Sequence, residues 1–122
     1  MYKEQEVREE TLKYFNGDEL ATNVFITKYC LRDTEGNFVE KSPADMHDRM
    51  ASEFARIETK YGGPRALTQE KIRNYFDNFK YIVPQGSPMM GIGNNYVNVS
   101  LSNCVVVDSP ASEPVDHRTW FQ

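Results

Sequence analysis

The sequence predicts a mainly α-helical chain that leads into one buried β-strand. Between residues 2 and 81, apolar side chains recur every three or four positions within several stretches, as they do in amphipathic helices. A loop with many glycine and proline residues follows at 84–96. Apolar and polar residues then alternate from Val97 and end in the apolar run Val105–Val107, which is typical of a strand inside a larger sheet.

Two helices are expected before residue 28. The first spans residues 2–15, where apolar and aromatic side chains lie among Lys and Glu, and it ends at Asn16 and Gly17. Asp18 is the expected N-cap of the second helix, at 18–27. The β-branched and aromatic second half of this segment is also compatible with extended structure. Residues 28–40 predict a small hairpin or a paired loop around a turn at 33–37.

The clearest helix start lies at Ser42, the expected N-cap, with Pro43 at the first helical position and Asp45 three residues after the cap. This helix is expected to end at Gly62–Pro64. A further helix is expected from the Thr68 cap to about residue 81. The apolar stripes of the two helices are Met46, Met50, Phe54, Ile57 and Tyr61 in the first, and Ile72, Tyr75, Phe76 and Phe79 in the second.

Length and composition indicate one ordinary globular domain. The chain has 122 residues, 39% hydrophobic and 26% charged, and a formal charge of -4, which argues against a duplex nucleic-acid binder although a local basic patch stays possible. No apolar run approaches the roughly 20 residues of a membrane-spanning helix, and the charged N-terminus does not resemble a secretory signal. We therefore expect a cytoplasmic protein without membrane contact.

Cys30 and Cys104 lack the paired spacing of a zinc site, so we expect free thiols and no structural metal.

The predicted strand lacks neighbours in this chain. A strand that is apolar on both faces needs partner strands at its edges and layers above and below it. Residues 108–122 follow Val107, and they are polar, contain proline and have no period. The strand pattern therefore predicts the first strand of a larger structure, whose other strands lie outside this sequence.

Two features have both a functional and a structural interpretation. The glycine-rich loop Gly86–Gly93 has the composition of loops that bring backbone N–H groups close to phosphate oxygens. It lacks the lysine of a P-loop and does not link a strand to a helix, so we favour a structural turn. Cys104, beside three valines, is expected to be a small core residue, and the alternative is a redox thiol at a strand edge that faces a cleft.

The other candidate side chains have structural interpretations. Cys30 stands between Tyr29 and Leu31 and is expected to pack in the core. His47 lies on a predicted helix, and its spacing from the neighbouring aspartates is not that of a metal-ligand set, so we expect a solvated histidine. No Ser-His-Asp set can be assembled from the two histidines of the chain.

Several stretches together resemble the large, catalytic subunit of ribonucleotide reductase, near the start of its core. Asp18–Phe25, followed by Lys28 and Tyr29, is similar to the opening helix of the family and the basic-aromatic pair after it. Residues 33–37 are similar to a turn that precedes a helix with an initial proline. The most specific matches are Pro84, then Ser87–Met90 with Gly93, and then Leu101–Cys104 with Val105–Val107. The resemblance covers roughly residues 8–110.

The resemblance implies roles for four residues. Ser87 matches the loop hydroxyl that holds the substrate diphosphate, and Asn103 stands where many members have a second serine beside the cysteine. Ser102 is a further candidate for that substrate contact. Cys104 matches the first cysteine of the pair that is oxidised to a disulfide as the ribose 2'-hydroxyl leaves. The strand that carries it belongs, in the family, to a ten-stranded α/β barrel.

Other family features have no counterpart in this sequence. The thiyl-radical cysteine, the finger loop, the second redox cysteine and the C-terminal cysteines of the family all match positions beyond Gln122, and residues 111–122 do not align. The resemblance begins close to Met1, so we expect no N-terminal ATP-cone, and such a start resembles the adenosylcobalamin-dependent class more than the class with a separate radical-generating subunit. The complete enzyme would need adenosylcobalamin or a dimetal radical subunit, and this piece is expected to bind no cofactor.

The sequence therefore predicts a helical domain at 1–83, a substrate loop with the first barrel strand at 84–110, and an irregular tail at 111–122. We expect an N-terminal piece of a reductase catalytic chain, from a split gene or a truncation, that is inactive alone and supplies its site residues in trans. Its expected partners are the remainder of that chain, a ribonucleoside di- or triphosphate and a possible radical-generating subunit. The alternatives are a non-catalytic helical interaction module or truncated remnant and, less favoured, a free-standing thiol redox protein.

Overall fold

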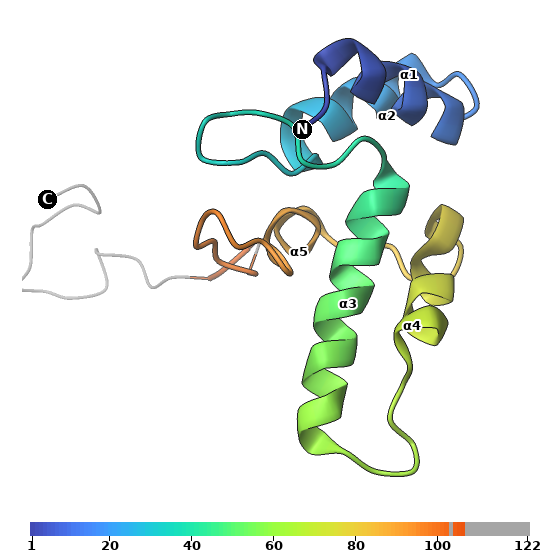
Figure 1. Cartoon of the computed structure of the whole chain (residues 1–122), viewed down its shortest axis with the longest axis vertical. Coiled ribbons are helices and arrows are strands. Elements are labelled where there is room, and N and C mark those ends of the chain that lie inside the picture. Colours follow the sequence, from blue (N-terminus) through green and yellow to red (C-terminus); the bar gives the residue numbers. More distant parts are fainter. Residues whose placement is uncertain (103, 107–122) are drawn as a thin grey trace, which may run out of the picture.

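The computed structural model describes residues 1–102 and 104–106, and this part of the chain is mainly α-helical, as the sequence predicts (Figure 1). Within it no β-strand is present, and extended residues pair only at isolated bridges. None of its helices is long and apolar enough to cross a membrane. The elements are α1 (Glu4–Tyr14), α2 (Glu19–Val24), the π-helix η1 (Phe25–Tyr29), α3 (Pro43–Tyr61), α4 (Gln69–Phe76), the 3-10 helix η2 (Asp77–Phe79) and α5 (Gly86–Gly91).

The long helix α3 organises the fold (Figure 1). The antiparallel partner of α3 is α4, which returns along it after the turn at residues 62–68. Helices α1 and α2 lie at the N-terminal end of α3, and α5 lies against η1. The first half of α3 therefore has neighbours on several sides, whereas its second half lies beside α4 and the segment that follows α5.

The predicted helix starts are confirmed, but the caps differ in detail. The Asp18 carboxylate accepts a hydrogen bond from the Ala21 N–H at 2.9 Å, and the Thr68 hydroxyl accepts one from the Lys71 N–H at 3.3 Å. Ser42 occupies the N-cap of α3, yet its side chain makes no capping hydrogen bond to the residues that the structure describes. The Asp45 carboxylate instead accepts the Lys41 N–H at 2.9 Å and so holds the residue before the cap.

The segment between η1 and α3 forms the expected paired loop. The Val39 N–H donates to the Leu31 carbonyl at 2.9 Å, and Phe38 forms antiparallel bridges with both Arg32 and Tyr2. The turn is closed by the Asp33 carboxylate, which accepts the backbone N–H groups at positions 35 and 37. The Asn37 side-chain amide also donates to this carboxylate at 3.0 Å, and this hydrogen bond together with the backbone ones favours the charged form and lowers the pKa of Asp33.

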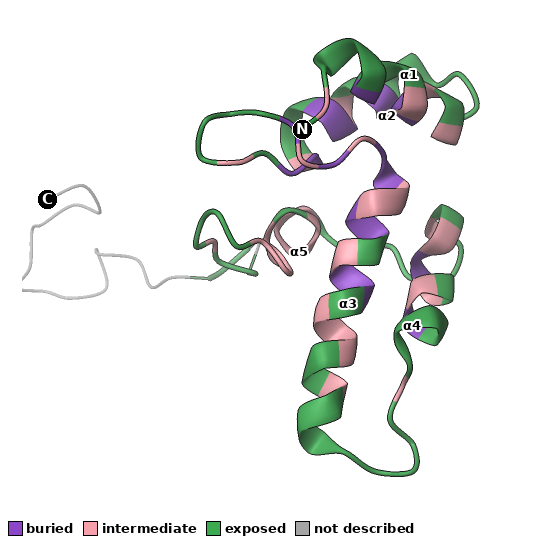
Figure 2. Ribbon diagram, viewed as in Figure 1, coloured by how far each residue is buried: buried purple, intermediate pink, exposed green. Residues whose placement is uncertain are grey.

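The core lies where the first half of α3 meets α1, η1, the paired loop and α4 (Figure 2). The predicted stripe of α3 is buried at Met46 and Met50, but Tyr61 is 85% exposed. The predicted apolar stripe thus packs in the core only along the first part of the helix, where α1 lies beside α3. The buried apolar side chains are Val7, Phe25, Ile26, Cys30, Leu31, Phe38, Met46, Met50, Ala51, Ile72 and Phe76.

The helix predicted from Thr68 to about residue 81 is too long by several residues. It ends at Phe76, and the backbone then turns through Asn78 and Phe79, with φ values of 52° and 53° in the left-handed region. Residues other than glycine rarely adopt this backbone conformation, so a contact must hold the turn. The Tyr14 hydroxyl oxygen accepts the Asn78 N–H at 3.0 Å, which ties the turn to α1.

The predictions for residues 84–107 were wrong in two respects. Gly86–Gly91 form the helix α5 instead of an irregular turn, and Pro88 is tolerated because it stands in the first turn, where N–H groups have no partner within the helix. Residues 97–102 and 104–106 are irregular instead of forming the expected strand, and Val105 is 73% exposed. A strand requires a hydrogen-bonding partner, and the described residues supply none to this segment. Position 107 and the predicted tail lie outside the described residues.

Candidate functional site

Two of the residues that the sequence assigned to the site, Ser102 and Cys104, line one open depression. Its lining includes Gln85 and Gly86 at the start of α5, together with Leu101, Ser102 and Cys104. Ser87 follows Gly86 directly, in the first turn of α5. The structure therefore brings Ser102 and Cys104 to the end of α5 that carries Ser87, whereas Asn103 lies outside the described residues.

The first turn of α5 is placed by a close contact with η1. A Cβ atom at Gly86 would meet the ring of Tyr29 at 3.2 Å and its hydroxyl oxygen at 3.3 Å. The absence of a side chain at Gly86 thus lets the helix approach Tyr29 closely. Tyr29 is the aromatic residue of the basic-aromatic pair noted in the sequence, and the structure places it against Gly86, which lines the depression.

The two cysteines differ sharply in environment. Cys104 is exposed, so its expected place in a core is wrong and the alternative of an accessible thiol fits the structure. Cys30 is buried, as expected, and its Sγ–H donates to the Glu40 carbonyl at 3.2 Å. Burial disfavours the thiolate and raises the pKa of Cys30 to about 12, with the Glu40 carboxylate adding to the effect. Because the thiolate is the reactive form, burial disfavours reaction at Cys30, and Cys104 is the accessible thiol.

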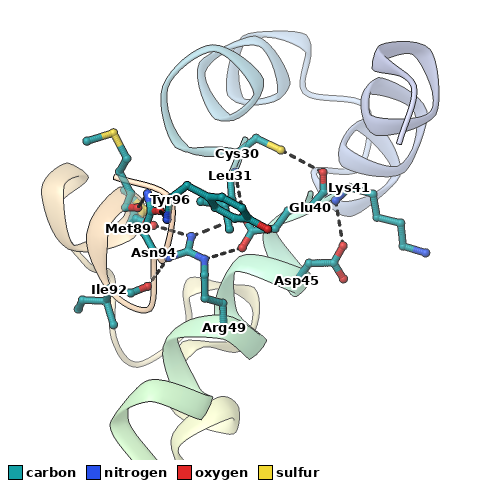
Figure 3. A network of polar contacts seen from close by, with 11 residues as sticks. Cys30, Leu31, Glu40, Lys41, Asp45, Arg49, Met89, Ile92, Asn94 and Tyr96 are labelled. Atoms are coloured by element: carbon teal, nitrogen blue, oxygen red, sulfur yellow. Dashed lines mark hydrogen bonds and ion pairs between the residues drawn. The ribbon is translucent and has the colours of Figure 1, made fainter. Parts of the chain in front are cut away.

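Sequence reasoning missed a buried ion pair that reaches α5 (Figure 3). Arg49 Nε donates to Glu40 Oε1 at 2.6 Å, and their side chains are only 10% and 5% exposed. Arg49 Nη2 donates to the Met89 carbonyl at 2.8 Å, and Nη1 donates to the Ile92 carbonyl. One sequence signal was available, since Arg49 stands three residues after Met46 and so lies on the buried face of α3.

The expectation of a solvated His47 was wrong. Its side chain is fully buried, it stacks on Phe76 with ring centroids 5.9 Å apart, and it meets Phe79 edge-on at 4.7 Å. Neither ring nitrogen has a hydrogen-bond partner among the described residues. Burial, helped by the nearby Arg73 guanidinium, lowers the pKa of His47 to about 4 and keeps the imidazole neutral near neutral pH. No group of three His, Cys, Asp or Glu side chains that could hold a metal ion occurs at 1–102 and 104–106.

Comparison with known proteins adds no relative. No family model matches the chain, and neither a curated protein nor a solved structure matches it. The proposal that follows therefore depends on the sequence motifs and on the arrangement of residues around the depression.

Proposed function

We propose that the chain is an N-terminal piece of a ribonucleotide reductase catalytic subunit, which acts only together with the remainder of that subunit. Ser87, with Ser102 and Asn103, contributes to binding the phosphates of a ribonucleotide, and Cys104 contributes one thiol of the redox pair. A cytoplasmic location belongs to the same proposal, because a reducing compartment keeps both cysteines as thiols. Adenosylcobalamin or a dimetal subunit would serve the complete enzyme, and no residue of this chain is assigned to hold it.

The observation that carries this proposal is the convergence of two motifs that are separated in the sequence. Gln85 and Gly86, which directly precede the Ser87–Met90 motif, line one side of the depression, and Ser102 and Cys104 of the second motif line another part of it. The reaction needs a phosphate contact and an accessible thiol close to each other. Exposure of Cys104 and burial of Cys30 support the choice of the reacting cysteine.

In the proposed reaction, the two electrons that reduce the ribose come from a pair of thiols, and no other group of this chain takes part in the electron transfer. Two thiols, Cys104 and a cysteine of the remainder, lose their hydrogens and form a disulfide. The ribose 2'-hydroxyl leaves as water and hydrogen takes its place at the 2' carbon. Reduction of the disulfide and generation of the radical fall to the remainder of the enzyme.

Reconstitution tests the proposal directly. The purified chain is assayed for deoxyribonucleotide formation alone and mixed with a reductase polypeptide that carries the barrel remainder and its radical cysteine. We expect turnover only in the mixture, and loss of turnover with retained assembly for Cys104→Ser. Cys30→Ser is the matched control and is expected to keep turnover, because the Cys30 thiol is buried. Turnover by the lone chain, or full turnover by Cys104→Ser in the mixture, would overturn the proposal.

The second candidate function is a non-catalytic helical interaction module. The exposed apolar side chains of the irregular segment favour it, since Val97 is 54% exposed and Val105 73% exposed. This candidate predicts that Cys104→Ser has no effect on any function of the assembled complex. The same reconstitution therefore separates the two.

A further inference from the structure

Helix α5 depends on outside donors for its C-terminal end. A helix leaves its last four carbonyl groups without partners in the helix, and a six-residue helix is marginal by itself. The Pro88 carbonyl accepts the Ile92 N–H at 3.0 Å, and Asn94 donates to the carbonyls of residues 90 and 91. The remaining carbonyl, that of Met89, and the carbonyl of the C-cap residue Ile92 both accept from Arg49.

Arg49 connects this helix end to a fixed part of the core (Figure 3). Its Nε meets a carboxylate oxygen of Glu40, whose other oxygen accepts the Leu31 N–H at 3.1 Å. Glu40 is thereby held by the paired loop, and α3 holds Arg49 itself. The backbone also comes close here, because a Cβ at Gly93 would lie 2.9 Å from the Arg49 Cγ. A planar guanidinium with donors on three nitrogens can serve these directions at once, whereas an ammonium cannot.

We propose that Arg49 is a positioning residue that fixes α5, and with it Ser87, relative to the helical domain. Ser87 and Gly86 form the first turn of the helix whose last turn Arg49 holds, so a shift of that end moves both. The consequence for substrate binding depends on the proposed function, whereas the effect on α5 does not.

The decisive variant is the double substitution Glu40→Gln with Arg49→Met. Arg49→Met alone would leave the buried Glu40 charge without its partner and destabilise the whole fold. The double variant removes both charges, so we expect the chain to stay folded while α5 loses its two outside hydrogen bonds. Hydrogen exchange at the Met89, Ile92 and Asn94 amides should become about tenfold faster, with the Ile72 amide of α4 unchanged.

Two further variants complete the exchange experiment. Arg8→Met with Glu19→Gln removes an exposed ion pair of 3.6 Å on α1 and α2 and should leave α5 exchange unchanged. Arg49→Lys keeps the positive charge beside Glu40. Its amide exchange rates at α5 should lie between those of the wild type and those of the double variant. If the double variant does not fold, Arg49→Lys decides the question. The proposal is overturned if the α5 amides exchange as slowly as in the wild type in the folded double variant, or in Arg49→Lys where the double variant does not fold.

The reconstituted complex gives a readout that a purely structural role would not move. We expect the double variant to raise KM for the ribonucleotide about tenfold and to change kcat by less than about twofold. A fall in kcat with unchanged KM would contradict a positioning role. If the wild-type mixture shows no turnover, the proposed function fails and the exchange result alone decides the role of Arg49.

Discussion

The imidazole of His47 stacks on the ring of Phe76, with the ring centroids 5.9 Å apart and an angle of 15° between the planes. This contact joins α3 to α4 inside the core. Phe79 meets the same imidazole edge-on, and Phe79 itself stands in the strained turn that Tyr14 holds. An imidazole that is neutral, buried and without hydrogen bonds to the described residues thus acts as an aromatic packing group.

The stability of the fold should fall in mild acid because of His47. Its pKa is about 4 in the folded chain against an ordinary 6.5, so the unfolded chain binds the proton more readily between these values. Stability is therefore retained above pH 6.5, decreases as the pH falls to about 4, and levels off below. From the two pKa values we expect a loss of about 2 kcal/mol between pH 7 and pH 5, measured by urea unfolding.

The His47→Phe variant is the control for this pH dependence. It keeps an aromatic ring between Phe76 and Phe79 but cannot be protonated, so its stability should vary much less between pH 7 and pH 5. The titrating groups around His47, namely Tyr14, Asp48, Arg73 and Asp77, are present in both chains. An equal loss of stability in wild type and variant would refute the assignment to His47.

The two cysteines should differ strongly in reactivity. Cys104 is exposed, whereas burial protects Cys30 and raises its pKa to about 12. In the folded chain we expect alkylation of Cys104 to be faster by at least about 100-fold, as followed by mass spectrometry. Cys104→Ser should abolish the fast phase, and denaturant should make Cys30 reactive. A fast phase that persists in Cys104→Ser would contradict this prediction.

Gly93→Ala should be more damaging than Gly36→Ala. Both glycines have positive φ, 72° at Gly93 and 88° at Gly36, so alanine adds backbone strain of about 1 kcal/mol at either position. The added Cβ at Gly93 would also lie 3.3 Å from the Arg49 carbonyl oxygen, whereas at Gly36 it meets no described atom within 4 Å. Thermal unfolding of both variants measures the difference. Equal losses would show that the contact with Arg49 costs nothing.

The two N-caps should respond differently to alanine. Asp18→Ala removes a capping hydrogen bond of 2.9 Å and should destabilise the fold by about 1 kcal/mol. Ser42→Ala should cost less than about 0.5 kcal/mol, because the Ser42 side chain makes no capping hydrogen bond within the described chain. Urea unfolding of the two variants tests the ranking. The reverse order would mean that the Ser42 hydroxyl does cap α3.

Sequence patterns predicted most of the helices because their signals are local. The Asp18 and Thr68 caps, the proline at position 43 and the glycines at 62 and 63 act on their own neighbouring backbone, so they have the same effect in any tertiary context. The burial of Met46 and Met50 followed from the same periodicity. The sequence also offered an accessible redox thiol as the alternative interpretation of Cys104. The structure fits this alternative, because Cys104 is exposed and lines the same depression as Ser102.

What the sequence by itself determined is the mainly helical class and the positions where most helices begin. Only the tertiary structure decided the burial of His47, the ion pair of Arg49 with Glu40, and the irregular course of residues 97–102. Each of these depends on a partner distant in sequence. A polar side chain is buried or solvated according to what packs over it, and a strand forms only where another backbone supplies its hydrogen bonds.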